Sequence, residues 1–268
     1  MGADIKKLRN RIKSVDSTLH LTKAMGLVAS SKMRRANEGM MRAREYGAAV
    51  HKAIAPLLGS ADCRQSRYMN PSEQGKSCLV VIAGDRGLAG GYNANVFRAI
   101  SGLIDGTDVI PIGKRACDRF KQEPTYVENF DYHSARDLAE TLCKDFCDGK
   151  YSEISVVYTK YISMISQEAC IMRLLPLSAE EETAPSDMVF EPDELTVLNS
   201  AVPEYVAGKL FSVIRESFAS EIAARRCAMD SAGKNAQEMI DGLQLQYNRA
   251  RQGAITQEIT EIVAGSGS

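Results

Sequence analysis

A glycine-rich turn is the stretch of this sequence whose residue types could most readily do chemistry. It reads GDRGLAGGYN, covers residues 84–93 and lies between an apolar run and an amphipathic segment. A strand, a glycine loop and a helix in this order can hold a phosphate at the helix N-terminus. The stretch lacks both the GxGxxG spacing of dinucleotide-binding loops and the Lys-Ser/Thr of a P-loop, and Asp85 would repel phosphate although Arg86 could offset it. We therefore expect a tight structural turn, with a nucleotide site as the alternative.

Other residues that could bind metals or act as nucleophiles are scattered. His20, His51 and His133 have no metalloprotease or hydrolase motif around them, so each is expected to be a surface or seam residue. The seven cysteines are an odd number without zinc-site spacing, which favours free thiols in a reducing cytoplasm. Cys143 and Cys147 are expected to be two buried thiols, with a redox or metal role as the alternative. The sequence thus predicts no catalytic residue, no cofactor and no metal.

Two long helices at the ends of the chain would have to position everything else. Residues 204–265 contain no proline and carry apolar residues at helical spacing, which predicts a single helix roughly 90 Å long. Residues 1–55 also lack proline and carry an unbroken series of three- and four-residue steps, as in a coiled-coil seam. The expected seam residues are Ile5, Leu8, Ile12, Val15, Leu19, Thr22, Gly26, Ala29, Met33, Ala36, Met40, Ala43, Gly47, Val50, Ile54 and Leu57, facing Phe211, Ile214, Phe218, Ile222, Met229, Ala232, Ala236, Met239, Leu243 and Tyr247. We expect an antiparallel coil with the rest of the chain inserted into it.

The inserted part alternates short apolar runs with amphipathic segments. The expected elements are strands at 77–83, 109–112, 125–130, 154–164 and 169–175, helices at 94–104, 114–121 and 134–146, and an acidic loop at 178–187. Such alternation predicts an open α/β sheet with a mixed edge. The predicted fold class is therefore α/β: an N-terminal shaft helix (1–58), a central Rossmann-like α/β domain (76–200) and a C-terminal shaft helix (203–265).

Charge is distributed unevenly along the chain. The net charge is −1, but residues 1–44 hold eleven Lys or Arg against three Asp or Glu. A basic helix can bind nucleic acid or an acidic protein surface, or its charges can simply solvate a coil. Composition does not separate these three possibilities. Charges interrupt every early apolar run, so neither a signal peptide nor a membrane span is expected.

Three stretches resemble signature stretches of a known family. LTKAMGLVASSKMRRA (21–36), DRGLAGGYN (85–93) and YNRARQGAITQEITEIV (247–263) closely resemble, in the same order, stretches of the gamma subunit of F-type ATP synthases of the bacterial type. The resemblance implies a central rotor shaft that threads a ring of alpha and beta subunits and rests with epsilon on the membrane ring of c subunits. It implies a non-catalytic, peripheral subunit at the cytoplasmic face of the bacterial cell membrane, which couples ion-driven rotation to ATP synthesis or hydrolysis and binds no nucleic acid.

The resemblance also implies which residues contact the partner subunits. Lys23 and Met25 resemble shaft residues that face the beta levers, and Arg225 resembles one that couples the shaft to beta. The full expected contact set is Lys23, Met25, Arg225, Arg251, Gln252, Thr256, Glu258, Ile259 and Ile262.

The apolar residues near the C-terminus lead to a separate expectation. The N-terminal helix is not expected to reach far enough to cover them, so they should be exposed and run in an apolar sleeve formed by partners. They are Ile255, Ile259, Ile262 and Val263. Two alternatives to the rotor shaft remain at this point: a nucleic-acid-binding coiled coil and a Rossmann-like nucleotide-dependent enzyme.

Overall fold

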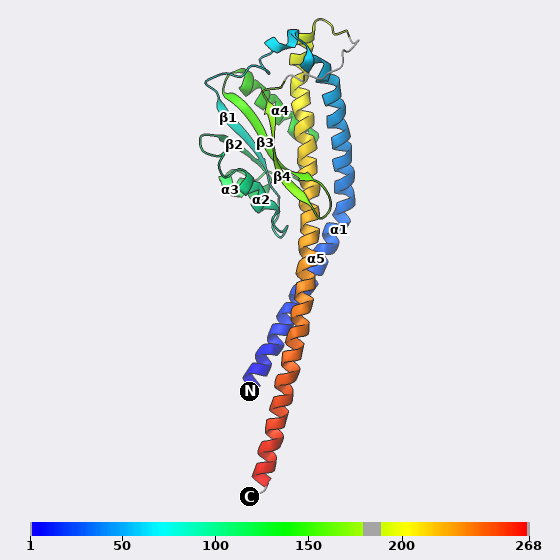
Figure 1. Ribbon diagram of the computed structural model, residues 1–268, viewed down its shortest axis with the longest axis vertical. Coiled ribbons are helices and arrows are strands. Elements are labelled where there is room, and N and C mark those ends of the chain that lie inside the picture. The colour runs from blue at the N-terminus through cyan, green and yellow to red at the C-terminus, as the bar shows by residue number, and fades with distance from the viewer. Residues whose placement is uncertain (1, 179–188, 267–268) are drawn as a thin grey trace. The chain divides into compact units, whose positions relative to one another are not determined.

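A computed structural model describes residues 2–178 and 189–266 of the chain. The chain divides into two compact units. The coil unit consists of Met1–Ser30 and Arg226–Ser268, and the domain unit is Ser31–Arg225. Two long helices, α1 (Gly2–Gly59) and α5 (Glu194–Ser266), contribute residues to both units (Figure 1). The acidic loop expected at 178–187 lies almost wholly outside the described residues.

A four-stranded sheet is the centre of the domain unit. Its order is β2-β1-β3-β4. Strand β1 (Lys76–Ile82) is parallel to both β2 (Asp108–Ile112) and β3 (Tyr151–Tyr161), whereas β4 (Gln167–Leu175) is antiparallel to β3. The predicted α/β class with a mixed edge is confirmed.

Helices cover both faces of this sheet, because alternate residues of the central strand point to opposite sides. Leu79 and Val81 pack with α2 (Tyr92–Ala99) and α3 (Lys114–Phe120). Val80 and Ile82 belong instead to the main core, which also contains residues of α4 (Tyr132–Cys147), α1 and α5. A short 3-10 helix, Asp62–Gln65, follows α1. Within the domain unit, Figure 1 shows α5 and α2 on opposite sides of the sheet.

The strand expected at 125–130 is wrong, since these residues form turns and irregular chain between α3 and α4. The backbone N–H groups of Val127 and Glu128 donate to the carboxylate of Asp85, at 2.9 Å and 3.0 Å. These donors are therefore unavailable to a sheet ladder. The side chain of Asp85 accepts the hydrogen bonds that a neighbouring strand would otherwise accept.

Helix α5 begins at Glu194, ahead of the start expected at residue 204, and it passes through Pro203. A proline inside a helix removes one hydrogen bond and disfavours the helix. Packing compensates here, because Leu198, Val202 and Val206 follow one another at four-residue steps and are fully buried in the main core. The tertiary environment overrides the local signal.

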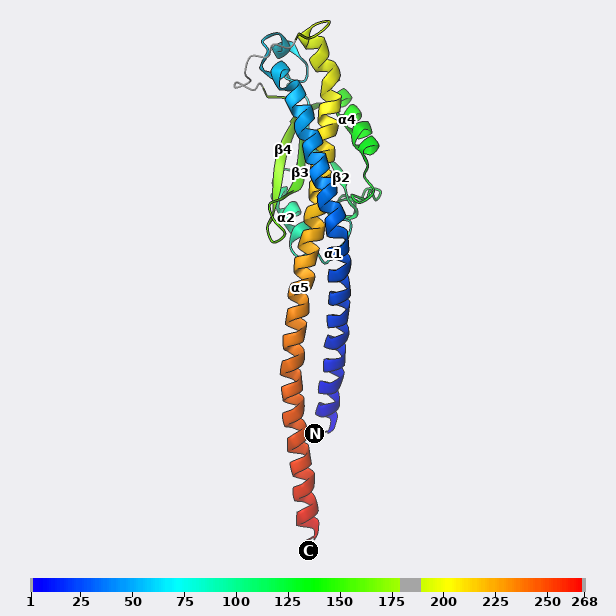
Figure 2. The ribbon, with the colours of Figure 1, turned by 90° about the vertical axis from the view of Figure 1, so that its right-hand side faces the viewer.

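Helices α1 and α5 are antiparallel and closely packed within each unit (Figure 2). In the domain unit, a Cβ added at Gly47 would lie 3.4 Å from the Cβ of Ser212, so glycine permits the close approach. In the coil unit, a Cβ added at Gly26 would lie 3.7 Å from the Cβ of Met229, and one at Gly233 would lie 3.6 Å from Oγ1 of Thr22. The antiparallel pairing predicted from the sequence is confirmed.

The seam of α5 in the coil unit differs from the expected one by a single residue. Met239 was expected to face α1, but its side chain is 48% exposed, whereas Ile240 is buried with Leu19 and Ala236. The steps from Ala236 through Ile240 to Leu243 are four and three, which keeps the stripe on one side of the helix. No helix in the described part of the chain has the length and hydropathy needed to cross a membrane.

Candidate functional site: the glycine-rich turn and the exposed end of α5

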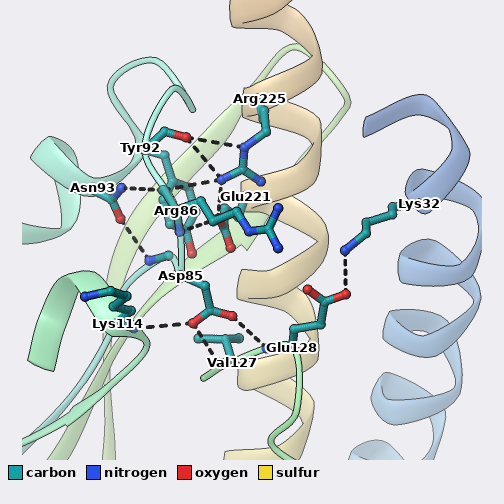
Figure 3. A network of polar contacts seen from close by, with 12 residues as sticks. Lys32, Asp85, Arg86, Tyr92, Asn93, Lys114, Val127, Glu128, Glu221 and Arg225 are labelled. Atoms are coloured by element: carbon teal, nitrogen blue, oxygen red, sulfur yellow. Dashed lines mark hydrogen bonds and ion pairs between the residues drawn. The ribbon is translucent and has the colours of Figure 1, made fainter. Parts of the chain in front are cut away.

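Asp85 organises the glycine-rich turn that follows β1. Its Oδ1 atom accepts hydrogen bonds from the backbone N–H groups of Lys114, at 3.3 Å, and Val127, at 2.9 Å, while Oδ2 accepts from Glu128 N at 3.0 Å. Figure 3 shows the carboxylate pointing toward all three donors. Lys114 is the first residue of α3, so Asp85 lies where a bound anion would meet that helix end. The carboxylate of Asp85 thus occupies the position that a bound anion would take. The structure contains the tight turn that the sequence predicted.

The same turn is held against α5 by a buried ion pair. Glu221 is buried, and its carboxylate pairs with the guanidinium of Arg225 one turn later. Arg225 also donates to the carbonyl oxygens of Arg86 and Gly87, at 3.3 Å and 3.4 Å, and Glu221 Oε1 accepts from Arg86 N at 3.4 Å. A Cβ at Gly84 would lie 2.8 Å from the Glu221 carboxyl carbon, so a larger residue there would push this carboxylate out of place.

Burial dominates the electrostatics of Glu221. Loss of hydration raises the pKa of this carboxyl above its ordinary value, while the Arg225 guanidinium beside it acts in the opposite direction. Asp85 adds a smaller contribution that also raises the pKa. The ion pair therefore favours the charged form of the buried carboxylate, and hydrogen bonds from both of its members fix the turn at one position along α5.

A second polar contact joins α5 to the end of β3. Glu216 Oε1 accepts from Arg44 Nη2 at 2.7 Å and from Tyr161 N at 2.9 Å. Ser217 Oγ accepts from Thr159 N at 3.0 Å. Strand β3 continues past the end of its pairing with β1 at Val157, and α5 takes over hydrogen bonding of its backbone. Sheet and helix are thereby held in a fixed register.

Two further contacts attach α1 to the rest of the domain unit. Lys32 Nζ lies 2.5 Å from Glu128 Oε1, so α1 is tied to the loop that Asp85 holds (Figure 3). The hydroxyl of Tyr46 donates to Glu204 Oε1 at 2.6 Å, and that of Tyr132 donates to the same oxygen. These hydrogen bonds lower the pKa of Glu204. They join α1, α4 and α5 at a single carboxylate.

The coil unit contains a different kind of surface at the C-terminal end of α5. After Ala254, which is half-buried, every described side chain is exposed. Four of these side chains are apolar and 46% to 70% exposed: Ile255, Ile259, Ile262 and Val263. Figures 1 and 2 both show this end of α5 extending past the N-terminus of α1. The expected exposure of these residues is confirmed.

Comparison with known proteins identifies the family. Residues 4–268 match the family model described as ATP synthase. The chain is 37% identical to the sodium-ion-specific ATP synthase gamma chain of Acetobacterium woodii over 99% of each chain, and 38% identical to the ATP synthase gamma chain of Ruminococcus albus over 98% of each. The chain belongs to the gamma-chain family of ATP synthases.

A solved structure matches this gamma chain in fold. It comes from the Euglena gracilis mitochondrial ATP synthase (OSCP/F1/c-ring, rotational state 3), with a TM-score of 0.67 and 18% identity over 98% of this chain and 94% of that one. The family predicted from the three signature stretches is confirmed.

The structure places the expected contact residues of this gamma chain in three settings. Lys23 is exposed and Met25 is half-buried, both in the α1 part of the coil unit. Arg225 belongs to the domain unit, and its charged group is bound to Glu221 and to the glycine-rich turn. The remaining expected residues are gathered on the exposed end of α5: Arg251, Gln252, Thr256, Glu258, Ile259 and Ile262.

Cys143 and Cys147 of the gamma chain are free thiols. Cys143 is buried, and burial raises its pKa to about 12, whereas Cys147 is only half-buried. Within the described residues, no three His, Cys, Asp or Glu side chains are grouped so that they could hold a metal ion.

Sequence reasoning missed the polar residues that attach α5 to the sheet. These buried residues are Glu216, Ser217, Ser220 and Glu221. A signal for them existed, since positions spaced by one, four and five residues share one side of a helix. A polar side within an otherwise apolar helical segment indicates that polar groups of another element pack there.

Proposed function

We propose that this gamma chain is the central rotor shaft of a bacterial F-type ATP synthase and carries torque without catalysing a reaction itself. One observation supports the proposal best: the end of α5 exposes Ile255, Ile259, Ile262 and Val263 in a region that α1 does not cover. Exposed apolar residues in such a cluster indicate a surface that a partner covers. In a rotor shaft, this end would turn inside a ring of alpha and beta subunits.

The face of α5 that meets the ring would be partly polar. Gln252, Ile255 and Ile259 follow one another at steps of three and four and therefore share a side of the helix. Arg251 and Thr256 flank that side, and all five side chains are exposed. We infer that the apolar groups slide against the ring, while the polar groups form hydrogen bonds with one beta subunit at a time.

The charge of α1 supports a protein partner as well. Residues 1–44 hold eleven basic against three acidic residues, and Lys23 is among the exposed basic ones. Such a surface attracts acidic segments of beta subunits by long-range electrostatics. The domain unit would then serve as the foot, in contact with epsilon and the c-subunit ring at the cytoplasmic face of the membrane.

The proposed lack of catalysis has a physical basis in the glycine-rich turn. The backbone donors of Lys114, Val127 and Glu128 are bound by Asp85. A phosphate would have to displace a carboxylate that is part of the same chain. The family assignment favours the rotor shaft over the two alternatives, a nucleotide-dependent enzyme and a nucleic-acid-binding coil.

A double substitution tests the coupling role. Gln252→Leu together with Thr256→Leu should leave the helix content and assembly of the complex unchanged but sharply lower both ATP synthesis and hydrolysis. Hydrogen bonds that form and break during each turn would be lost, at about 0.5–1.5 kcal/mol each. The matched control is Gln246→Leu, an exposed glutamine of the same helix where the coil seam is still covered. Normal turnover in an assembled double mutant would remove this face from the mechanism.

A second experiment tests the apolar sleeve. Ile259→Asp with Ile262→Asp introduces two charges into the surface that would slide against the ring, so assembly or rotation should fail. The isolated chain should keep its stability, because both side chains are already exposed. Unimpaired rotation in single-molecule assays would contradict a sleeve at this end of α5.

A further inference from the structure

A groove of about 540 Å³ lies in the domain unit, on the side where α1 and α5 run together. Arg35, Arg42 and Arg215 line it, together with the rings of Phe211 and Phe218. Gly39 lies in its α1 wall. Its volume is in the range of small-molecule sites, about 300–1,000 Å³.

The positive charge of the groove is largely uncompensated. Lys32 at its edge is paired with Glu128, but within the described part of the chain none of the three arginines forms an ion pair. Arg215 lies over the ring of Phe211, 5.1 Å from its centre, and is half-buried. Burial lowers the pKa of Arg215, with Asp131 acting weakly in the opposite direction. A bound anion would relieve the cost of this partly desolvated charge.

Gly39 leaves the α1 wall of the groove open. A glycine inside a helix weakens it relative to alanine, so its presence usually has a steric reason. Such a reason exists at Gly47, where an added Cβ would lie 3.4 Å from Ser212. At Gly39, an added Cβ would meet no atom within 4 Å. Internal packing therefore does not explain this glycine, and the open space above it belongs to the groove.

We propose that this groove binds a small anionic aromatic molecule, a planar ring system that carries two or more negative charges. Guanidinium groups bind phosphate, sulfonate or carboxylate groups through paired hydrogen bonds, and the phenylalanine rings pack against a flat ring system. The volume of about 540 Å³ lies within the range of small-molecule sites, about 300–1,000 Å³. The site lies in the domain unit and does not depend on the rotor contacts proposed for the end of α5.

Binding of 8-hydroxypyrene-1,3,6-trisulfonate, with ADP as a second probe, tests this site on the full-length chain. Fluorescence anisotropy and calorimetry should show saturable binding of one molecule per chain. Arg42→Gln and Arg215→Gln should each weaken it about tenfold, because each removes a charge-assisted contact. Gly39→Leu should abolish binding by filling the groove. Circular dichroism should stay unchanged, because the space above Gly39 is open.

Arg34→Gln is the control for general charge attraction, since Arg34 is exposed on the same helix, pairs with Glu38 and does not line the groove. It removes the same charge and should leave binding within about twofold. Equal weakening by Arg34→Gln would mean general charge attraction and overturn the proposal, as would groove variants that bind normally. The assembled ATP synthase must also bind the probe. Binding to the free chain but not to the complex would make the groove a contact for another subunit and overturn a small-molecule site.

Discussion

The two parts of α5 contrast within a single helix. In the domain unit, residues such as Leu210 and Ile214 are fully buried in the main core, and the polar side chains of Glu216 and Glu221 are buried too. In the coil unit, only a stripe that includes Ile240 is buried, and all described side chains beyond Ala254 are exposed. One part is fixed from several sides, whereas the other is supported from one side only.

The contrast shows how one helix can be both an anchor and a contact surface. Glu216 pairs with Arg44 of α1, and Glu216 and Glu221 each accept from a backbone donor of another element, so any shift of the helix would break directional polar contacts. A heptad stripe of apolar side chains has no such directional requirement. We therefore expect substitutions in the two parts to differ in how much stability they cost, in how far along the chain the loss is felt, and in how the loss depends on pH.

The largest difference is expected between two matched core substitutions. Leu210→Ala should destabilise the domain unit by about 2–5 kcal/mol, because it leaves a cavity in a core closed on all sides. Ile240→Ala should cost less, about 1.5–3 kcal/mol, and its effect should stay within the coil unit. Urea denaturation with hydrogen exchange resolved by residue measures both. If both substitutions lowered hydrogen-exchange protection equally in the domain unit and in the coil unit, the two parts of α5 would not differ as proposed.

Arg225→Gln should destabilise the chain by about 3 kcal/mol at pH 7, because it leaves Glu221 buried without a counter-charge. The folded-state pKa of Glu221 is already raised by burial and should rise further in this variant. A raised carboxyl pKa favours the folded state below the unfolded value, and this advantage is lost as pH rises through the folded value. The defect should therefore be small near pH 4 and grow toward neutral pH. Arg226→Gln, which removes a neighbouring charge that forms no ion pair with any described residue, should show no such pH dependence.

A smaller effect with the opposite pH dependence is expected for Glu204→Gln. Hydrogen bonds from Tyr132 and Tyr46 lower the pKa of Glu204, so its stabilising contribution is present above the ordinary glutamate pKa and is lost as pH falls through the folded value. The substitution should cost about 1 kcal/mol at pH 7 and almost nothing near pH 3. Denaturation curves at the two pH values measure it. An equal loss at both would mean that the carboxylate charge is not what stabilises this junction.

The smallest effect is expected for Met239→Ala, next to the buried Ile240. Met239 is exposed, so the change should stay within about 0.5 kcal/mol, the range of ordinary surface substitutions. Thermal unfolding of the Met239→Ala variant, compared with that of the Ile240→Ala variant, measures the difference. A loss equal to that of Ile240→Ala would place Met239 in the seam and shift the register by one residue.

The sequence was sufficient for the long helices wherever their periodicity was continuous. Every expected seam position described on α1, from Ile5 to Leu57, is buried or half-buried. On α5, Met239 and Ile240 are adjacent apolar residues, so periodicity alone did not decide between them. Pro203 was interpreted as a boundary because a local rule cannot include the packing of Leu198 and Val202.

The glycine-rich turn shows a different limit. Its residue types predicted a tight turn, but the partners of Asp85 are 29 to 43 residues away along the chain. No local pattern identifies donors at that separation. Glu221 is similarly distant from the turn that it holds, at 135 residues from Arg86. Polar contacts between remote segments required the structure, whereas repeated apolar spacing did not.

The carboxylate of Asp85 has one more consequence. A loop that closes around a diffusible nucleotide loosens when the nucleotide leaves, so its stiffness follows the metabolic state of the cell. Here the anion is tethered to the loop it holds, and its effective concentration does not change with supply. A part that must transmit force equally well when ATP is scarce and when it is plentiful gains from such independence.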